Sequence, residues 1–362
     1  MTSTTTTVQA LPVQVIGGVD THQDTHAAAV IDMTGRRLGD RQFPATAAGY
    51  RQLVAWLRTF GALQVVGIEG SGAYGAGLAR HLAGERVAMV EVDRPDRKTR
   101  RFAGKSDPLD ADAAARAALA RVRTGVPKDR GGEVEALPNL RVARRSAVDQ
   151  RADCQRRIKS LVVTAPDALR DQLRGLTVAR LVKACAGLRP DPARIGDPEQ
   201  AAKTALRSLA RRHLALTTEI NDLDALIEPQ VTRINPELVA RLGVGADVAG
   251  QLLVTAGQNT DRLHSEAAFA MLCGVAPVPA SSGKTHRHRL NRGGDRQANA
   301  ALHRVTLSRM RWNPRTRAYV QRRTAQGLSK KDIIRCLKRI VARELYPLLR
   351  PAHLADHPVM AD

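Results

Sequence analysis

Aromatic residues are scarce in this chain: phenylalanine, tyrosine and tryptophan make up 3% of its 362 residues. Cysteine is rarer still, and its four copies stand far apart without a C-x-x-C pair. The first shortage argues against a protein that recognises unpaired bases by stacking them on aromatic rings. The second excludes a zinc knuckle and a disulfide framework, so we expect reduced, buried and inert thiols at Cys154, Cys185, Cys273 and Cys336.

Long apolar runs are absent as well. No run approaches the roughly 18 residues that a membrane-spanning helix needs. The Thr-rich stretch at residues 1–7 does not resemble a signal peptide. We therefore expect a soluble cytoplasmic protein without a membrane partner.

Positive charge is what the chain has in excess. Lys and Arg number 57 against 35 Asp and Glu, which gives a formal net charge of +22. Such an imbalance predicts a polyanionic partner, most simply nucleic acid contacted through its phosphates. The surplus is uneven, because residues 284–350 hold 19 Lys and Arg against three acids. This region is the better candidate for the main DNA contact.

The chain length predicts two domains with a helical spacer. Residues 13–92 alternate between apolar runs and amphipathic stretches, as in an α/β domain. We expect strands over 13–19, 27–32, 64–69 and 86–92, and helices over 49–60 and 75–83. Strands separated by helices imply parallel pairing in a sheet that is covered on both faces.

The composition becomes helical and charged between residues 110 and 226. Loop-like interruptions at 127–132 and 189–198 divide this region into several helices. A seam typical of one helix packed on another, or of a coiled coil, consists of Leu209, Leu216, Ile220, Leu223 and Ile227. We expect a helical spacer or an oligomerisation arm.

A second compact unit is expected after the spacer. Near its start, Gly243 and Gly245 separate two short helices. Glycines there either let backbone N–H groups approach a phosphate, as in helix-hairpin-helix elements, or form a C-cap and a tight turn. The last helix has an apolar face of Ile333, Leu337, Ile340, Val341 and Leu345. Domains are therefore predicted over 1–125, 126–234 and 235–350, with a disordered tail over 351–362.

Four acidic residues follow a pattern suited to metal chemistry. Asp20 ends one apolar strand and Glu69 ends another, so neighbouring strands would bring both carboxylates to one edge of the sheet. Asp107 and Asp110 are three residues apart at a helix start, on one side of its first turn. Mg²⁺ prefers carboxylate ligands, and two such ions can clamp the attacking and leaving oxygens of a phosphodiester. The set predicts an Mg²⁺ (or Mn²⁺) site in a ribonuclease-H-like domain.

Other roles stay open for the helix-start pair. Asp107 precedes Pro108 and is a good N-cap, with proline at the first helical position. Asp110 then completes something like a capping box. Capping alone can therefore explain both residues.

Other residues near the acidic set stay open as well. Asp24 rivals Asp20 as a ligand, and the spacing does not exclude Asp112. His22 and His26 are four residues apart, a spacing that binds metal on a helix. Because they follow a strand here, we expect them to line a polar hairpin.

A second candidate site is the serine pair in Ser281-Ser282-Gly283. Glycine permits close approach to a phosphate, and cations neutralise the charge that develops during transfer. The cations that we expect to contact nucleic acid are Lys284, Arg287, Arg289, Arg292 and Arg296, with Lys105 beside the aspartate pair. The simpler interpretation is a basic DNA-contacting loop, since no partner base is evident beyond His286, His288 and the carboxylates of the first domain.

Together these motifs resemble the transposases of the insertion-sequence-110 family, in the family's order and over most of the chain. The motifs are Val19-Asp20-Thr21-His22, Gly67-Ile68-Glu69-Gly70-Ser71-Gly72, Lys105-Ser106-Asp107-Pro108-Leu109-Asp110-Ala111, Gly243-Val244-Gly245, and Gly274-Val275-Ala276-Pro277 with Ser282-Gly283-Lys284 and Arg292-Gly293-Gly294-Asp295-Arg296. One departure is Leu290-Asn291-Arg292, because family members commonly have a Lys-Arg-Gly-like step there. It alters the contacts expected of this loop and leaves Ser282 in place.

The resemblance implies a three-part architecture and a mechanism. An α/β RuvC-like domain would carry its Asp-Glu-Asp-Asp set at Asp20, Glu69, Asp107 and Asp110. A helical coiled-coil region and a mainly α-helical transposase domain with Ser282 as nucleophile would follow. The family is understood to recombine donor and target DNA, guided by a structured bridge RNA, through a covalent phosphoserine link. A homo-oligomer, dimer or tetramer, in the bacterial cytoplasm at the nucleoid is expected.

Three functions fit these features. The leading one is a site-specific recombinase, in which Ser282 attacks a phosphate that metal ions on the acidic set orient. A RuvC-like nuclease or junction resolvase would instead use metal-activated water, with Ser282 as a DNA contact only. A non-catalytic nucleic-acid-binding protein would keep only the basic surface.

Overall fold

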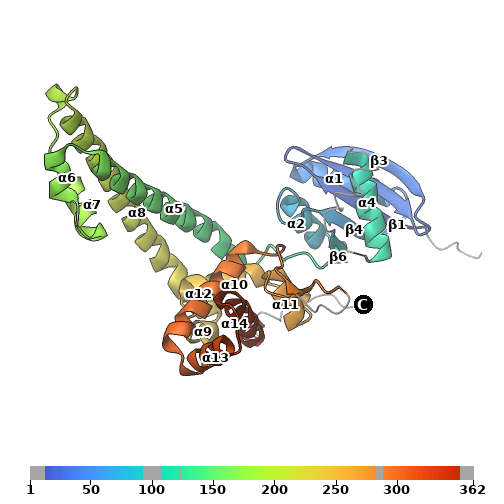
Figure 1. Cartoon of the computed structure of the whole chain (residues 1–362). Helices are drawn as coiled ribbons and strands as arrows, with labels where there is room; N and C mark the ends of the chain where they lie inside the picture. Colours follow the sequence, from blue (N-terminus) through green and yellow to red (C-terminus); the bar gives the residue numbers. More distant parts are fainter. Residues whose placement is uncertain (1–12, 93–106, 123, 283–287, 351–362) are drawn as a thin grey trace, which may run out of the picture. The chain divides into compact units, whose positions relative to one another are not determined.

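Two compact units make up the computed structural model (Figure 1). The described residues are 13–92, 107–122, 124–282 and 288–350. The amino-terminal unit comprises Met1–Gly132 and Gly257–His264, and the helical unit comprises Glu133–Ala256 and Ser265–Pro351. The three predicted domains remain predictions, and the predicted tail lies outside the described residues.

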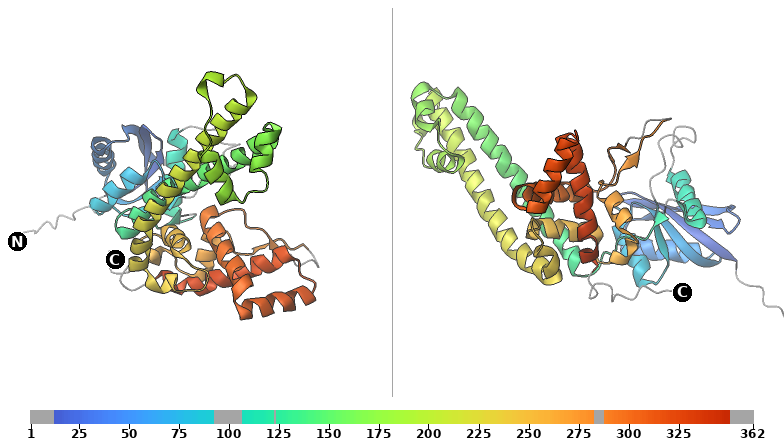
Figure 2. Two further views of the ribbon diagram at one scale, coloured as in Figure 1. Left: turned by 90° about the vertical axis from the view of Figure 1, so that its left-hand side faces the viewer. Right: turned by 60° about the horizontal axis from the view of Figure 1, so that its bottom comes forward.

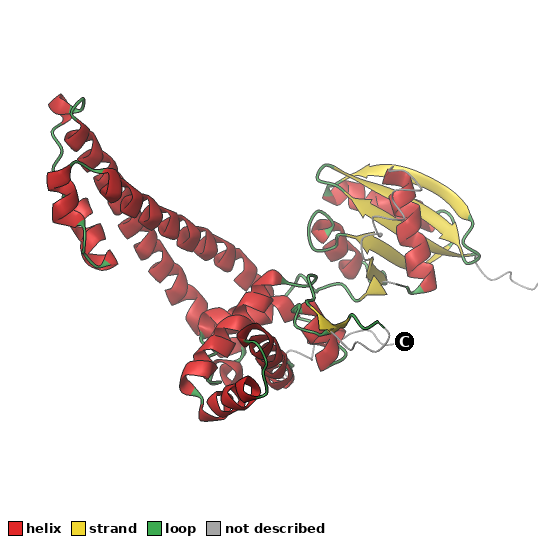
Figure 3. Cartoon of the chain, in the orientation of Figure 1, coloured by secondary structure: helices red, strands yellow, loops and turns green. Residues whose placement is uncertain are grey.

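A six-stranded mixed sheet is the centre of the amino-terminal unit (Figure 3). Its strands are β1 (Gln14–Thr21), β2 (Thr25–Asp32), β3 (Arg37–Pro44), β4 (Ala62–Glu69), β5 (Met89–Val92) and β6 (Thr124–Gly125), in the order β3-β2-β1-β4-β5-β6. The predicted parallel pairing is confirmed, because β4 lies parallel to β1 and to β5. The sequence did not reveal β3, whose side chains are mostly exposed and lack the apolar alternation of a half-buried strand.

Helices cover both faces of this sheet, as predicted. α1 (Ala47–Arg58) and α2 (Ala76–Gly84) pack on one face and bury Leu53, Leu57, Leu78 and Leu82. α4 (Asp107–Ala120) covers the other face with the small side chains of Ala111, Ala115 and Ala118. A helix can therefore approach the sheet more closely on the α4 face than on the face covered by α1 and α2.

Two glycines let α4 lie directly against the strands. Gly18 of β1 faces this helix, and a methyl group on it would lie 2.2 Å from the carbonyl oxygen of Ala111 and 2.2 Å from the amide nitrogen of Ala115. A methyl group on Gly67 of β4 would meet the backbone of the same helix at 2.5 Å. Because these contacts involve backbone atoms, any larger residue would displace the helix.

Two long helices run side by side in the helical unit (Figure 2). They are α5 (Leu137–Thr164) and α8 (Pro198–Ile234). α6 (Asp167–Leu173) and α7 (Val178–Ala186) pack on one end of the pair and share an apolar core with it. The predicted interruptions thus separate real helices.

The seam predicted along α8 is buried in part. Leu216, Ile220 and Ile227 are buried, whereas Leu209 and Leu223 are half-buried. The packing of one helix on another is confirmed by this burial. The supercoil of a coiled coil stays a prediction.

Shorter helices form a cluster with the other end of the long pair. They are α9 (Pro236–Val239), α10 (Ala246–Ala256), α11 (Glu266–Leu272), α12 (Arg296–Trp312), α13 (Pro314–Ala325) and α14 (Lys330–Leu345). Asp247 of α10 joins the two parts, since it pairs with Arg141 of α5 at 3.1 Å and with Arg304 of α12 at 2.9 Å. Within the described ranges, no helix is long and apolar enough to cross a membrane.

The packing of α4 predicts different effects of two glycine-to-alanine changes. In Gly18→Ala the methyl group meets helix backbone, so the free energy of unfolding should fall by at least about 2 kcal/mol. Gly84→Ala adds a methyl group in open space on α2 and should leave stability unchanged or raise it by up to about 1 kcal/mol. In a Trp312→Phe background, the fluorescence of Trp56 reports urea unfolding of the amino-terminal unit alone. Equal stability of both variants would contradict the packing.

Candidate metal and nucleic-acid sites

Two carboxylates lie side by side at one edge of the sheet. Asp20 of β1 and Glu69 of β4 are register partners on adjacent parallel strands. Gly18 and Gly67, which face α4, lie two residues before Asp20 and Glu69. Because side chains alternate along a strand, both carboxylates point toward the same helix. They are only 8% and 6% exposed. A divalent cation bound at this edge would stabilise two carboxylates that are this well buried.

The first turn of α4 supplies the second pair of carboxylates. Asp107 and Asp110 both lie in this turn. Asp110 is 8% exposed, while the side chain of Asp107 is 39% exposed. Carboxylates in a first turn also interact favourably with the helix dipole, so a stabilising role and a ligand role are compatible here.

His22 joins this site, although the sequence suggested only a polar hairpin. Its Nδ1 lies 3.7 Å from Oδ2 of Asp20, and its Nε2 lies 3.9 Å from Oδ1 of Asp107. Ligand atoms of these three residues all lie within 4.8 Å of one another, and this group does not include Glu69 or Asp110. A signal for His22 exists in the sequence, because it follows Asp20 by two residues and so leaves the strand on the same side.

Other nearby residues that the sequence left open lie elsewhere. Asp112 pairs with Arg116 at 2.6 Å, and Asp24 is exposed in the turn after β1. His26 is fully buried and stacks on Tyr50 of α1, with ring centroids 5.6 Å apart. Desolvation in this core lowers the pKa of His26. His26 lies in the β1–β2 hairpin opposite Thr21, as predicted, but the polar setting expected for it is wrong, because its ring is buried against Tyr50 of α1.

The donor set at this edge fits a hard divalent cation. Most of its members are carboxylates, which are the usual protein ligands of Mg²⁺ and Mn²⁺. Three of the four predicted carboxylates are buried, so a cation bound among them would also stabilise their negative charge. A metal ion held here would polarise phosphate oxygens and stabilise the charge of a transition state.

Ser282 lies in a short hairpin of the helical unit. β7 (Val278–Pro279) and β8 (His288–Arg289) pair antiparallel over two residues each. Ser281 and Ser282 follow β7, and both are exposed. His288 is exposed on the returning strand. The hydroxyl of Ser282 is thus on the protein surface, as a group that attacks DNA must be.

The cations predicted to contact nucleic acid fall into two groups. Arg289, Arg292 and Arg296 are exposed on β8 and up to the start of α12. Lys105, Lys284 and Arg287 lie outside the described residues, as does His286. The described members support a basic surface around the hairpin.

α13 adds to this basic surface, within the region 284–350 where the sequence shows its surplus of positive charge. None of its residues is buried, and its cations are Arg315, Arg317, Arg322 and Arg323. Trp312, at the end of α12, is 62% exposed and has the guanidinium of Arg311 4.8 Å from its ring centroid. An exposed ring of this kind offers a stacking surface despite the low aromatic content.

The Gly243-Val244-Gly245 turn packs on α12. Gly243 has a φ of +83°, which other residues rarely adopt. A methyl group on it would lie 3.2 Å from Cβ of Ser308. α9 ends at Val239, four residues before Gly243. These features favour a tight structural turn over a phosphate-binding one.

Carboxylates that could hold a divalent metal at one edge of a sheet, in a chain whose other unit is rich in exposed cations, are suited to an enzyme that transfers DNA phosphodiester bonds. Two family models match the chain in agreement with this. A transposase model named for the DEDD set of IS110 covers residues 17–165, and one described as transposase IS116/IS110/IS902 family covers residues 238–321. The chain belongs to the IS110 family of transposases and is a DNA transposase or recombinase. The first match implies a RuvC-like fold and points to the use of a divalent metal.

Proteins of two insertion elements are similar to this chain. An uncharacterized 42 kDa protein of insertion element IS900 from Mycobacterium paratuberculosis is 26% identical, over 95% of this chain and 97% of that protein. An uncharacterized 43.6 kDa protein of insertion element IS110 from Streptomyces coelicolor is 32% identical, over 41% of this chain and 35% of that protein. The similarity to the first protein therefore spans both units.

The acidic edge predicts stabilisation by metal. With Mn²⁺ at a hundredfold excess over its Kd, the amino-terminal unit should gain about 2.7 kcal/mol of stability. Asp20→Asn should abolish this gain, because an amide replaces a carboxylate ligand. Thermal unfolding followed by Trp56 fluorescence measures both effects. Asp40→Asn, at an exposed position of β3 away from the site, is the matched control and should respond to Mn²⁺ like the parent. A full response of Asp20→Asn would remove Asp20 from the metal ligands.

The basic surface predicts steep salt dependence of DNA binding. If six or more phosphates are neutralised, affinity should fall by about 10³-fold or more between about 50 and 200 mM salt. Arg292→Gln with Arg296→Gln should lower the slope of log affinity against log salt by about two. Fluorescence anisotropy with a labelled duplex measures the slope. Arg170→Gln, on α6 and paired with Asp167, is the control and should not change it. Identical slopes for all three proteins would exclude Arg292 and Arg296 as phosphate contacts.

Proposed function

We propose that this transposase is a site-specific recombinase that cuts and rejoins DNA through a covalent phosphoserine formed by Ser282. The observation that carries the proposal is an exposed serine on a cation-flanked hairpin, in a chain that also has a carboxylate edge on its sheet. The family match supports DNA as the substrate.

Serine attack conserves the bond that rejoining needs. In cutting, Oγ of Ser282 attacks a DNA phosphorus, its proton passes to a base, and one bridging P–O bond breaks to free a hydroxyl end. In rejoining, a hydroxyl end attacks the phosphoserine, a new P–O bond forms, and the serine is released with its proton restored. No water is consumed, so the phosphodiester is exchanged and not hydrolysed.

The acidic edge is proposed to hold Mg²⁺ or Mn²⁺ for this reaction. Its ligands would be Asp20, Glu69, Asp107 and Asp110, with His22 as an addition. When bound, the ion stabilises negative charge on the phosphate. The protein itself positions the ligands through β1, β4 and α4, and exposed arginines around the hairpin neutralise phosphate charge.

Target choice is proposed to rest with a structured guide RNA of the bridge type. The described cations are exposed on hairpin and helix surfaces that suit contacts to phosphate and to nucleic-acid shape. Such contacts do not read base sequence, which base pairing with an RNA would supply. Assays of DNA cleavage should therefore contain RNA transcribed from the DNA that flanks the gene in its insertion element.

A homo-oligomer, dimer or tetramer, is proposed to hold donor and target DNA together. Apolar side chains are exposed along the two long helices, where Val142, Val163 and Leu226 are 71%, 70% and 60% exposed. Such residues on a helical arm are suited to contacts with another copy.

The proposed nucleophile is tested by trapping. With flanking RNA and a nicked suicide substrate, the parent should form a covalent protein–DNA species, visible as a shifted band after denaturation. Ser282→Ala should lose this species and strand cleavage together, because no other group replaces the attacking oxygen. Ser281→Ala, one residue away and equally exposed, is the matched control and should keep both.

One outcome would favour hydrolysis in place of serine attack. If Ser282→Ala still cleaves DNA in a metal-dependent way and the parent forms no covalent species, activated water is the nucleophile. The enzyme would then act as a RuvC-like nuclease. Ser282 would be left as a DNA contact.

A further inference from the structure

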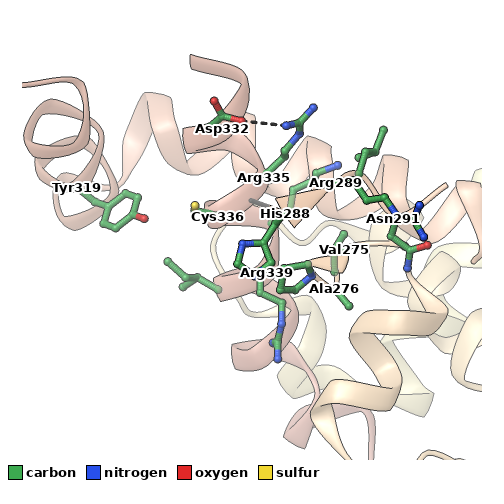
Figure 4. Close-up of a pocket in the computed structure, with 15 residues that line it drawn as sticks. Val275, Ala276, His288, Arg289, Asn291, Tyr319, Asp332, Arg335, Cys336 and Arg339 are labelled. Carbon is green, nitrogen blue, oxygen red and sulfur yellow. Dashed lines mark hydrogen bonds and ion pairs between the residues drawn. The ribbon is translucent and has the colours of Figure 1, made fainter. Parts of the chain in front are cut away.

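A pocket of about 370 Å³ opens beside the hairpin that carries Ser282 (Figure 4). Its walls come from residues 274–277 and 288–291, from Tyr319 of α13 and from one side of α14. The volume lies in the range of small-ligand pockets, about 300–1,000 Å³. It admits one small group but not a DNA duplex.

One wall of the pocket is apolar. It consists of Val275, Ala276, Pro277 and Ile340. Ile340 was expected in the buried face of α14, but it is 43% exposed because it faces the pocket. Cys336, expected to be buried, is half-buried for the same reason. Uncovered apolar surface inside a pocket indicates a ligand with an apolar part.

The cations on α14 indicate that the ligand also has a negatively charged part. Figure 4 shows Arg335 beside its ion-pair partner Asp332, 2.9 Å away, and Arg339 is paired with a glutamate. Lys338 differs, because its Nζ donates to the amide oxygen of Asn299 at 2.8 Å. Over the described part of the chain no carboxylate pairs with this ammonium group.

The positive charge of Lys338 is therefore not balanced by a carboxylate among the described residues. Lys338 is half-buried, and desolvation, followed by repulsion from Arg335, lowers its pKa. Arg289, on the hairpin side of the same pocket, is a second cation. An anionic group in the pocket would offset both the desolvation and the repulsion.

We propose that this pocket binds one unpaired nucleotide of the DNA strand being cut, with its phosphate on Lys338 and its base against the apolar wall. A nucleotide has a phosphate for the cationic side of the pocket and a flat base, small enough to fit, for its apolar wall. A base inside a duplex is stacked and paired, so only an unpaired nucleotide can enter. Because the pocket adjoins the hairpin, the occupant would hold the strand near Ser282. This role in cutting rests on the proposed function, whereas the binding does not.

Binding of gapped DNA tests the proposal. The probes are a labelled duplex and the same duplex with a short single-stranded gap, and anisotropy measures their affinities for the full chain. The parent should prefer the gapped probe. Lys338→Gln should weaken gapped binding about tenfold, the effect of one lost phosphate contact, and change duplex binding by less than about twofold. Ala276→Leu, which fills the apolar wall, should also remove the preference.

Two variants serve as controls. Lys331→Gln removes an exposed charge from the same helix outside the pocket and should leave the preference intact. Lys338→Arg keeps the positive charge and should retain most of the preference for gapped DNA. Equal weakening of both probes by Lys338→Gln would overturn the proposal, since Lys338 would then be a general phosphate contact. A preference shown only by an RNA version of the gapped probe would overturn the assignment to DNA.

Failure of this proposal is distinguishable from failure of the proposed function. The binding assay needs no cleavage, so Ser282→Ala should keep the full preference for gapped DNA. Loss of the covalent species with the preference intact would overturn the serine mechanism alone. A normal covalent species without any preference would overturn the nucleotide pocket alone.

Discussion

The close approach of α4 to the sheet is the constraint on which the acidic site depends. Gly18 and Gly67 leave no side chain between strands and helix, and the helix residues that face them are alanines. The separation of packed elements depends on the side chains at their contact. The position of Asp107 relative to Asp20 is therefore determined by small residues along the helix, more than by the acidic residues themselves.

The two candidate sites have different structural support. The carboxylates stand on central strands of a six-stranded sheet and on a packed helix. Ser282 stands on a hairpin with two paired residues in each strand. Isolated two-stranded hairpins are marginally stable, so the conformation of this one depends on its surroundings, including bound DNA. In the proposed reaction, the serine would receive a phosphate from one strand and pass it to another, while the carboxylates would hold the metal from packed elements.

Sequence patterns predicted the features that depend on local residues. Gly243 and Gly245 lie between two short helices, α9 and α10, as predicted, because the signals for a turn are local. Strand-end positions likewise predicted that Asp20 and Glu69 would be neighbours. The proximity of His22 to Asp107 was not predictable, because it depends on where α4 packs. For the same reason, periodicity placed Ile340 on the apolar face of α14 but could not show that a pocket leaves it uncovered.

The length of α8 sets a distance that the chain can span. Its 37 residues correspond to about 55 Å at a rise of about 1.5 Å per residue. Duplex DNA advances about 3.4 Å per base pair, so this helix is as long as roughly sixteen base pairs. Groups attached to its two ends could therefore contact positions about one and a half helical turns apart on a single DNA molecule. The length of the helix is thus comparable to that of a short binding site on DNA.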